Sequence, residues 1–99
     1  MADVIISERA IADLDEIWDY IAEDSVRSAD QVIDRIHRRC LYLGDHPEIG
    51  MKRDDLQPGL RRILEGRFAI FYRSRAGVLE VVRILRGERD LPGMFGGSG

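Results

Sequence analysis

The residues of this 99-residue chain that could carry chemistry are mainly arginines. Those on or beside the β-like runs of its second half are Arg61, Arg62, Arg67, Arg73, Arg83, Arg86 and Arg89. A guanidinium group stays charged at any cellular pH and binds phosphate through two parallel hydrogen bonds. The cluster therefore indicates either a phosphate-facing surface or a set of solvated ion pairs with nearby carboxylates, which would contribute little. Because strand residues alternate between faces, Arg61 and Arg62 cannot act together.

Acid–base catalysis has few candidates in this sequence. RNA cleavage through the ribose 2′-hydroxyl needs a base, an acid and cations that stabilise the phosphorane. The arginines could supply the cations, but both histidines, His37 and His46, lie in or just after a helical segment, and no His or Tyr follows Tyr72. The chain also contains no glycine-rich phosphate loop and no nucleophile elbow. We therefore assign no catalytic residue.

Length and composition indicate one small domain. A chain with 44% hydrophobic and 33% charged residues fits a single core, which we assign to residues 1–95. The segment GGSG at 96–99 is typical of a linker. The lone Cys40 cannot form an internal disulfide and the two histidines offer no zinc spacing, so we expect neither a metal nor a cofactor. No apolar run approaches the ~20 residues of a membrane span, and no basic leader begins the chain, so we expect a cytoplasmic protein without membrane contact.

The net charge of −3 hides an uneven distribution. Residues 1–50 contain 12 acids and 5 bases (−7), whereas residues 51–99 contain 6 acids and 10 bases (+4), and the two sum to −3. One surface could therefore face an acidic or nucleic-acid partner while another repels it. The alternative is that the helices simply carry acids and the strands carry arginines.

Apolar periodicity predicts two helices after a short N-terminal strand at residues 3–6. Ser7 is a suitable cap for the first helix, at about 8–23. Its apolar stripe consists of Ile11, Leu14, Ile17, Trp18 and Ile21. A serine in the segment 25–28 could cap the second helix, which Gly44 and Pro47 end. The second stripe consists of Ala29, Val32, Ile33, Ile36, Cys40 and Leu43. The short connection between the stripes predicts an antiparallel helical hairpin.

Three β-like runs, 60–65, 68–73 and 78–85, are separated by short turns and predict an antiparallel meander. The fold class is therefore α+β, with an N-terminal strand and an antiparallel helical hairpin packed on a C-terminal antiparallel β-meander. The middle run is partly apolar on both of its faces. We expect the hairpin to bury one face of the sheet and the other face to stay available to something else.

Three segments in the correct order resemble the ParE branch of the RelE/ParE toxin superfamily, from bacterial type II toxin–antitoxin modules. They are ADLDEIWDYIAED at 12–24, LQPGLRRILEGRFAIFYR at 56–73 and VVRILRGERDLPGMF at 81–95. The resemblance spans about residues 4–95 and implies the same order of strand, hairpin and sheet. It also implies a toxin that arrests DNA gyrase with cleaved DNA, touching DNA only through the gyrase complex, and a ParD-type antitoxin that neutralises it. Family members often have His where this chain has Arg86.

On this resemblance the chain is a binding toxin and not an enzyme. The residues that we expect to contact gyrase or nucleic acid are Arg61, Arg67, Arg83, Arg86 and Arg89. We expect the antitoxin to lay an amphipathic helix along the hairpin, or to add a strand at an open sheet edge. Its expected contacts are Trp18, Ile21 and Ile33, although these residues could instead belong to the core.

Two other functions remain open at this point. The RelE branch consists of ribosome-dependent mRNA endoribonucleases, whose basic positions Arg61 and Arg83 could match. That branch also uses a C-terminal Tyr, His or Glu, and this chain has no counterpart of the Tyr or His. The third hypothesis is an interaction module that keeps the fold without toxicity.

Overall fold

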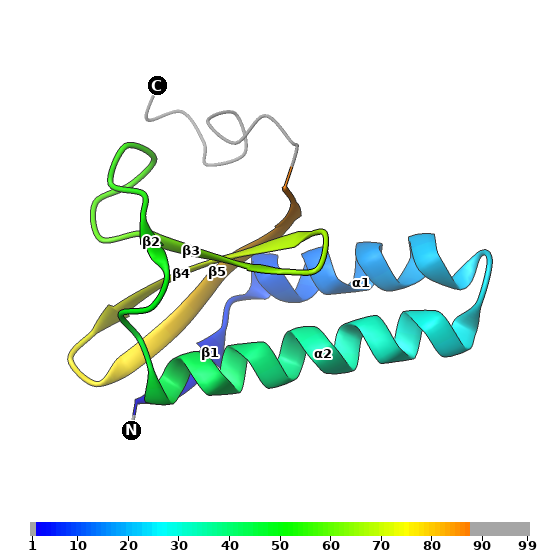
Figure 1. Ribbon diagram of the computed structural model, residues 1–99, viewed down its shortest axis with the longest axis horizontal. Coiled ribbons are helices and arrows are strands. Elements are labelled where there is room, and N and C mark those ends of the chain that lie inside the picture. Colours follow the sequence, from blue (N-terminus) through cyan, green and yellow to red (C-terminus); the bar gives the residue numbers. More distant parts are fainter. Residues whose placement is uncertain (1, 88–99) are drawn as a thin grey trace.

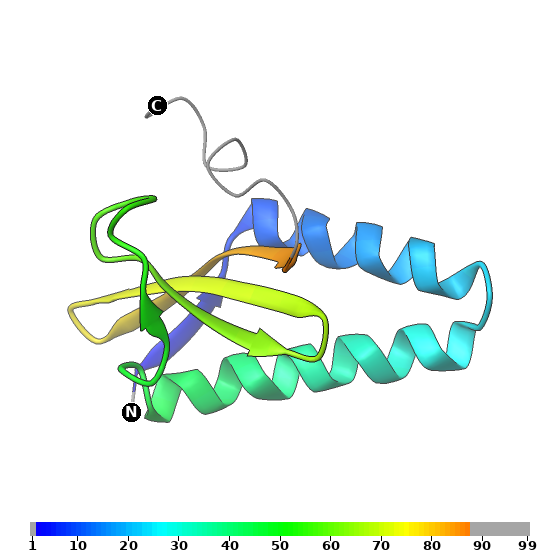
Figure 2. The same ribbon diagram turned by 45° about the horizontal axis from the view of Figure 1, so that its top comes forward.

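A computed structural model describes residues 2–87 of the chain, so Arg89 and the linker-like 96–99 lie outside the described residues. The elements follow in the order β1 (Asp3–Ile6), α1 (Glu8–Ala22), α2 (Val26–Asp45), β2 (Met51–Lys52), β3 (Arg61–Glu65), β4 (Phe68–Arg75) and β5 (Val78–Arg86). The two helices lie antiparallel, and their connected end extends beyond the sheet (Figure 1, Figure 2). The predicted α+β fold with its hairpin and meander is confirmed.

Both helices begin at serine caps. The Ser7 hydroxyl accepts the backbone N–H of Ala10 at 3.0 Å, and the Ser25 hydroxyl accepts that of Ser28 at 3.1 Å. Such a cap contributes typically about 1 kcal/mol because it satisfies a backbone donor that the first helical turn leaves unpaired. Ser25 is therefore the residue that caps the second helix.

Gly44 lets β1 approach the end of α2. The Ala2 amide donates to the Gly44 carbonyl at 3.0 Å, and a Cβ at Gly44 would lie 2.7 Å from Val4 Cγ2. Only glycine fits this contact without displacing the strand. The sequence assigns Gly44 to the end of the second helix, but α2 continues to Asp45, so the role of this glycine is the close packing of helix against strand.

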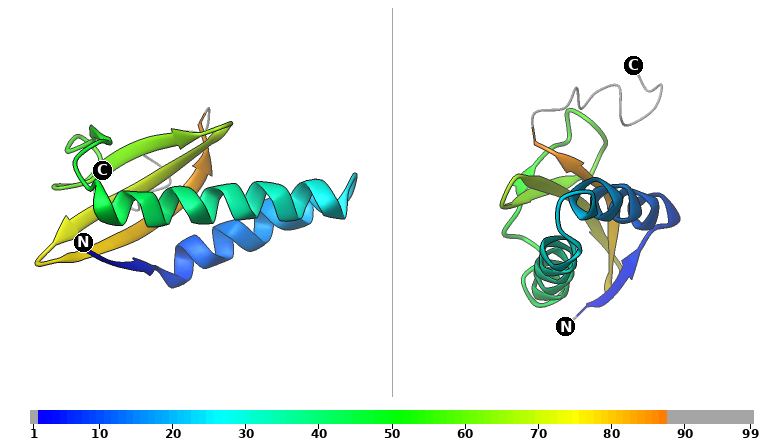
Figure 3. Two further views of the ribbon diagram at one scale, coloured as in Figure 1. Left: turned by 60° about the horizontal axis from the view of Figure 1, so that its bottom comes forward. Right: turned by 90° about the vertical axis from the view of Figure 1, so that its right-hand side faces the viewer.

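The main core lies between the hairpin and one face of the sheet (Figure 3). Its largest fully buried members are Ile36, Leu43, Ile70, Tyr72, Leu79 and Ile84. The opposite face is not as free as the sequence indicates. Leu56 and Leu60, from the segment between β2 and β3, pack there against Ala69, Phe71 and Leu85. The expectation of an open second face is therefore wrong over this part of the sheet, because a turn-rich segment with two buried leucines covers it.

Five strands form one sheet in the order β1-β5-β4-β3-β2. β1 pairs parallel with β5, from Asp3 opposite Val78 to Ile6 opposite Val81. β2 pairs antiparallel with β3 and is only two residues long, too short for a periodic signal. The pairing of β4 with β5 shifts by one residue, so that Val82 is a bulge between Val81 and Arg83. Beyond this bulge β5 continues where β1 has already ended.

Candidate functional site

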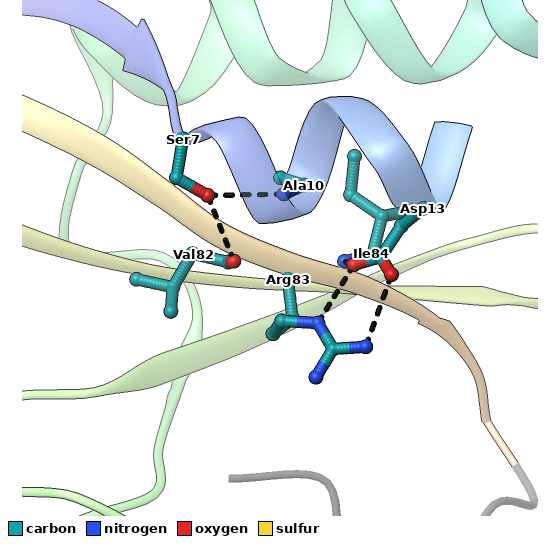
Figure 4. A network of polar contacts seen from close by, with 6 residues as sticks. All are labelled: Ser7, Ala10, Asp13, Val82, Arg83 and Ile84. Carbon is teal, nitrogen blue, oxygen red and sulfur yellow. Dashed lines mark hydrogen bonds and ion pairs between the residues drawn. The ribbon is translucent and has the colours of Figure 1, made fainter. Parts of the chain in front are cut away.

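Arg83 lies inside the protein and binds Asp13 of α1 (Figure 4). Its Nε and Nη2 donate to the two carboxylate oxygens at 2.8 and 3.0 Å. The side chains of Arg83 and Asp13 are only 8% and 3% exposed. Because this guanidinium is held in a buried ion pair, we remove Arg83 from the expected contact surface.

The Asp13 carboxylate also closes the edge of the sheet where β1 has ended. Its Oδ2 accepts the backbone N–H of Ile84 at 2.9 Å, while the Ser7 hydroxyl donates to the carbonyl of Val82 at 3.0 Å (Figure 4). Side chains of the first helix thus satisfy backbone groups that a neighbouring strand would otherwise pair. This edge does not offer the Ile84 amide to an added strand.

A groove of about 650 Å³ lies between the hairpin and the end of the sheet where β3 turns into β4. Its apolar lining includes Ile17, Ile21, Val32, Ile36 and Phe68. Besides the Asp13–Arg83 pair, its charged lining consists of Arg9, Glu16, Arg35, Glu65, Arg67 and Arg86. The lining thus contains four arginines and two glutamates besides that pair. One of the glutamates, Glu65, also lies 3.7 Å from Arg39, outside the lining. The groove combines an apolar floor with an excess of positive charge.

Arg67 and Arg86 are neighbours at one side of this groove. The Gly87 amide donates to the Arg67 carbonyl at 3.1 Å, and Phe68 lies directly opposite Arg86 in the sheet. The Arg86 guanidinium lies 5.2 Å from the centre of the Tyr20 ring, within cation–π range. Tyr20 is 64% exposed, and both arginines are exposed. We call Tyr20, Arg67 and Arg86 the groove mouth.

Arg61 lies apart from the groove and holds the segment before β2. Its Nη1 donates to the carbonyls of Glu48 at 3.1 Å and Gly50 at 2.8 Å. In the same place the Tyr72 hydroxyl accepts the Gly50 amide at 2.8 Å and donates to the Pro47 carbonyl at 2.9 Å. Burial raises the pKa of Tyr72. Arg61 therefore has a structural role that the sequence pattern did not indicate.

The residues expected to contact an antitoxin do not lie together on one surface. Ile21 lines the groove. Ile33 packs against the main core, and Trp18 is half-buried, with its indole N–H donating to Asp30 of α2 at 2.8 Å. Trp18 and Ile33 are not among the residues that line the groove. The structure thus separates Ile21 from two residues that hold the hairpin together.

Sequence reasoning missed Tyr20, Arg9 and Arg35 as members of the site. A signal for Tyr20 is present, because Glu16, Ile17 and Tyr20 follow the helical spacing that places side chains on one face. The groove side of α2 could not be found in this way, because only the packing against the sheet determines which helix side stays open.

The lining of the groove has the residue types of a protein-binding surface. Neither His37 nor His46 lines the groove. Arginine and tyrosine are enriched among the residues that contribute most to binding at protein interfaces, and the apolar side chains of the groove provide surface that a partner can cover. Within residues 2–87, no helix is both long enough and apolar enough to cross a bilayer. The fold and the groove therefore define a small α+β domain with a binding surface.

Comparison with known proteins gives the family. The family described as "ParE toxin of type II toxin-antitoxin system, parDE" matches residues 4–91. The chain belongs to this family of ParE toxins. Toxin ParE1 of Mycobacterium tuberculosis is 32% identical over 89 residues, which cover 88% of this chain and 91% of that toxin. Toxin ParE1 of Caulobacter vibrioides is 33% identical, over 81% of this chain and 83% of the relative.

Another relative and a solved structure agree with this assignment. Toxin ParE3 of C. vibrioides is 30% identical over 97% of both chains. A chain of the structure described as "Chromosomal ParDE TA system from P. aeruginosa" superposes with a TM-score of 0.76 at 27% identity, over 89% of this chain and 98% of that one. The resemblance found in the sequence is thereby confirmed at the level of family and fold.

Proposed function

We propose that this ParE-family toxin inhibits DNA gyrase in the cytoplasm by binding it, and that a ParD-type antitoxin neutralises it. Family membership carries the proposal, together with a groove that is rich in arginine and contains no histidine. The toxin acts without catalysis of its own. It reaches DNA only through the gyrase complex.

The gyrase contact centres on Arg67 and Arg86. Both arginines are exposed and adjacent, and guanidinium groups can pair with carboxylates of the target or with phosphates of its bound DNA. Arg89 follows closely in sequence and stays part of the proposed contact, although it lies outside the described residues. Arg61 contributes mainly through the segment that it holds, and Arg83 supports the fold.

The antitoxin segment is proposed to be an amphipathic helix that lies in the groove. Its apolar side would cover Ile21 and Phe68, and its acidic side chains would pair with Arg35 and Arg67. The excess of positive charge in the groove supports this complementarity. The solved relative belongs to a ParDE system, which supports a ParD-type partner for this chain as well.

A supercoiling assay tests the gyrase proposal. Purified toxin is added to gyrase, ATP and plasmid DNA, and both lost supercoiling and trapped double-strand breaks are scored. We expect inhibition by the wild-type chain and at least tenfold weaker inhibition by Arg67→Ala and Arg86→Ala. Arg75→Ala is the matched control, because Arg75 is an exposed arginine of β4 that does not line the groove. A folded wild-type chain that leaves gyrase unaffected would contradict the proposal.

The ribonuclease alternative is weakened by the burial of Arg83. This residue could match a basic position of the RelE branch, yet its guanidinium binds Asp13 and cannot reach a phosphorane without breaking a buried ion pair. Ribosome-bound mRNA incubated with the toxin provides the test. Cuts at fixed codon positions that disappear in Arg61→Ala would favour the ribonuclease, and intact mRNA would favour the gyrase target.

A further inference from the structure

The face of the sheet opposite the hairpin, which we call the second face, is covered over only part of its length. The segment between β2 and β3 covers it with Leu56 and Leu60. Leu64 pairs with the buried Ala69, and directly paired residues project to the same face, so Leu64 also belongs to the second face. This leucine is 49% exposed. An apolar side chain therefore remains uncovered beside the second-face core.

Arg62 lies beside Leu64 on the same face. It is two residues earlier in β3 and directly opposite Phe71, a residue of the second-face core. Its Nε is buried and has no hydrogen-bond partner among the residues that the structure describes. A buried N–H group without an acceptor is destabilising. The second face thus combines an apolar side chain to be covered with a cationic donor that lacks an acceptor.

The described chain ends against these two side chains. Gly87 follows β5, and its amide donates to the carbonyl of Arg67 at 3.1 Å. A Cβ at Gly87 would lie 4.0 Å from both Arg62 Nη2 and Leu64 Cδ2. The segment after Gly87 therefore begins within reach of the uncovered part of the second face and does not have to cross the sheet to arrive there.

The sequence after Gly87 has the matching chemistry. It reads ERDLPGMF at 88–95, with carboxylates at Glu88 and Asp90 and apolar side chains at Leu91, Met94 and Phe95. A carboxylate forms a strong charge-assisted hydrogen bond with a guanidinium N–H. Apolar side chains that cover Leu64 remove apolar surface from water, which is favourable. The segment thus offers both of the groups that the second face lacks.

We propose that residues 88–95 pack back onto the second face, with the Glu88 carboxylate accepting a hydrogen bond from Arg62 and the apolar side chains covering Leu64. Because successive residues of an extended segment point to opposite sides, Arg89 then projects away from the sheet, beside the groove mouth. Arg62 and Leu64 are thus positioning residues for Arg89. The packing does not depend on the gyrase target, and only its use in holding Arg89 rests on the proposed function.

Labelling of an introduced thiol tests the packing. Leu64→Cys places a thiol on the second face, and the native Cys40 is only 1% exposed, so it reacts little in the folded chain. We expect the thiol at position 64 to react roughly tenfold faster when the three apolar residues of 88–95 are replaced by Ser. Leu41→Cys is the control, because Leu41 is an exposed residue of α2 whose labelling rate should not change. Equal rates at position 64 with and without the serine substitutions would overturn the packing.

A charge exchange tests the pair between Arg62 and Glu88. In the Leu64→Cys background, Glu88→Arg should speed the labelling, because it places two cations together. Adding Arg62→Glu should restore the slow rate, because the exchanged pair again has opposite charges. A double variant that is labelled as fast as Glu88→Arg alone would overturn the pairing and show that Arg62 supports the sheet in another way.

The supercoiling assay tests whether the packing holds Arg89 for the gyrase contact. The three serine substitutions should raise the toxin concentration for half-inhibition of gyrase roughly three- to tenfold, and Arg89→Ala should add little further loss in that background. A full additional loss from Arg89→Ala would overturn the positioning of Arg89. A wild-type chain that leaves gyrase unaffected but shows the labelling difference would overturn the proposed function, and with it the role of Arg89, while the packing stands.

Discussion

Asp13 of the first helix and Arg83 of the last strand form a buried ion pair with two hydrogen bonds, across 70 residues of sequence. The same carboxylate accepts the amide of Ile84. Three polar groups are thus satisfied together on the side of β5 where β1 has already ended. Because a buried charge without a partner is costly, the pair favours the packing in which Asp13 of α1 lies against Arg83 of β5.

Removing one partner of this pair should destabilise the protein strongly. We expect Asp13→Ala to lower the free energy of unfolding by about 3–5 kcal/mol, because it removes the carboxylate that binds the buried Arg83 guanidinium through two hydrogen bonds. Urea unfolding measures this change. The control is Arg73→Ala, which breaks the exposed Arg73–Glu80 pair on the same sheet and should cost less than about 1 kcal/mol.

Replacing both partners should recover part of the loss. The double variant Asp13→Leu with Arg83→Met removes both charges of the buried pair, so it should be more stable than Asp13→Ala. It should still lose about 1–3 kcal/mol relative to the wild-type chain, because the Ile84 amide has no acceptor. A double variant no more stable than Asp13→Ala would show that the pair is not the source of the effect.

The Tyr72 hydroxyl should stabilise the segment before β2. Tyr72→Phe removes two hydrogen bonds and leaves the Gly50 amide buried, so we expect a loss of about 1–3 kcal/mol in urea unfolding. Gly50→Ala should destabilise by a similar amount, because its Cβ would lie 2.4 Å from the Tyr72 hydroxyl oxygen. Tyr42→Phe, at an exposed tyrosine, should change stability by less than about 0.5 kcal/mol.

Substitutions at two isoleucines of the hairpin should affect antitoxin binding and stability differently. Ile21→Ala should weaken antitoxin binding roughly tenfold, because Ile21 lines the groove. Ile33→Ala should lower the free energy of unfolding by about 2 kcal/mol and leave binding of the antitoxin nearly unchanged, because Ile33 packs against the core. Isothermal titration and urea unfolding measure the two effects. Equal loss of binding in both variants would place the antitoxin along the hairpin instead of in the groove.

Cys40 should make the protein sensitive to alkaline pH. Burial raises the pKa of this thiol from 9.0 to about 11, so between these values the folded chain holds a proton that the unfolded chain releases. Stability due to this group is therefore complete below pH 9 and falls as the pH rises toward 11, by about 2–3 kcal/mol. Unfolding in urea from pH 7 to 10.5 should show a steeper decline for the wild-type chain than for Cys40→Ala. Parallel curves would contradict this assignment.

The elements of the fold could be predicted because their signals are local. The apolar stripe of the first helix, the serine cap at Ser7 and the alternating run at 68–73 each report on their own segment. The β1–β5 pairing could not be predicted in this way, because these two parallel strands meet only when the helical hairpin and the three strands between them have folded. β2 was missed because two residues carry no period.

The sequence indicates that the candidate site contains arginines, but it does not indicate which of the arginines belong to it. Arg67, Arg83 and Arg86 look alike in the sequence, yet one pairs with Asp13 and the others stay exposed. No local pattern distinguishes them, because the partner of Arg83 is 70 residues away. For the same reason the sequence does not show that Ile21 lines the groove while Ile33 packs against the core, because both belong to apolar helix stripes.

The sequence by itself determined the α+β class, the two capped helices and the presence of an arginine-rich half, because helix periods, caps and composition act over a few residues. Only the tertiary structure decided which arginine is buried, which isoleucine lines a groove and that Tyr20 meets Arg86. Those outcomes depend on contacts between segments that are distant along the chain. The free energy of such contacts depends on how the hairpin packs against the sheet and on which polar groups lose water there.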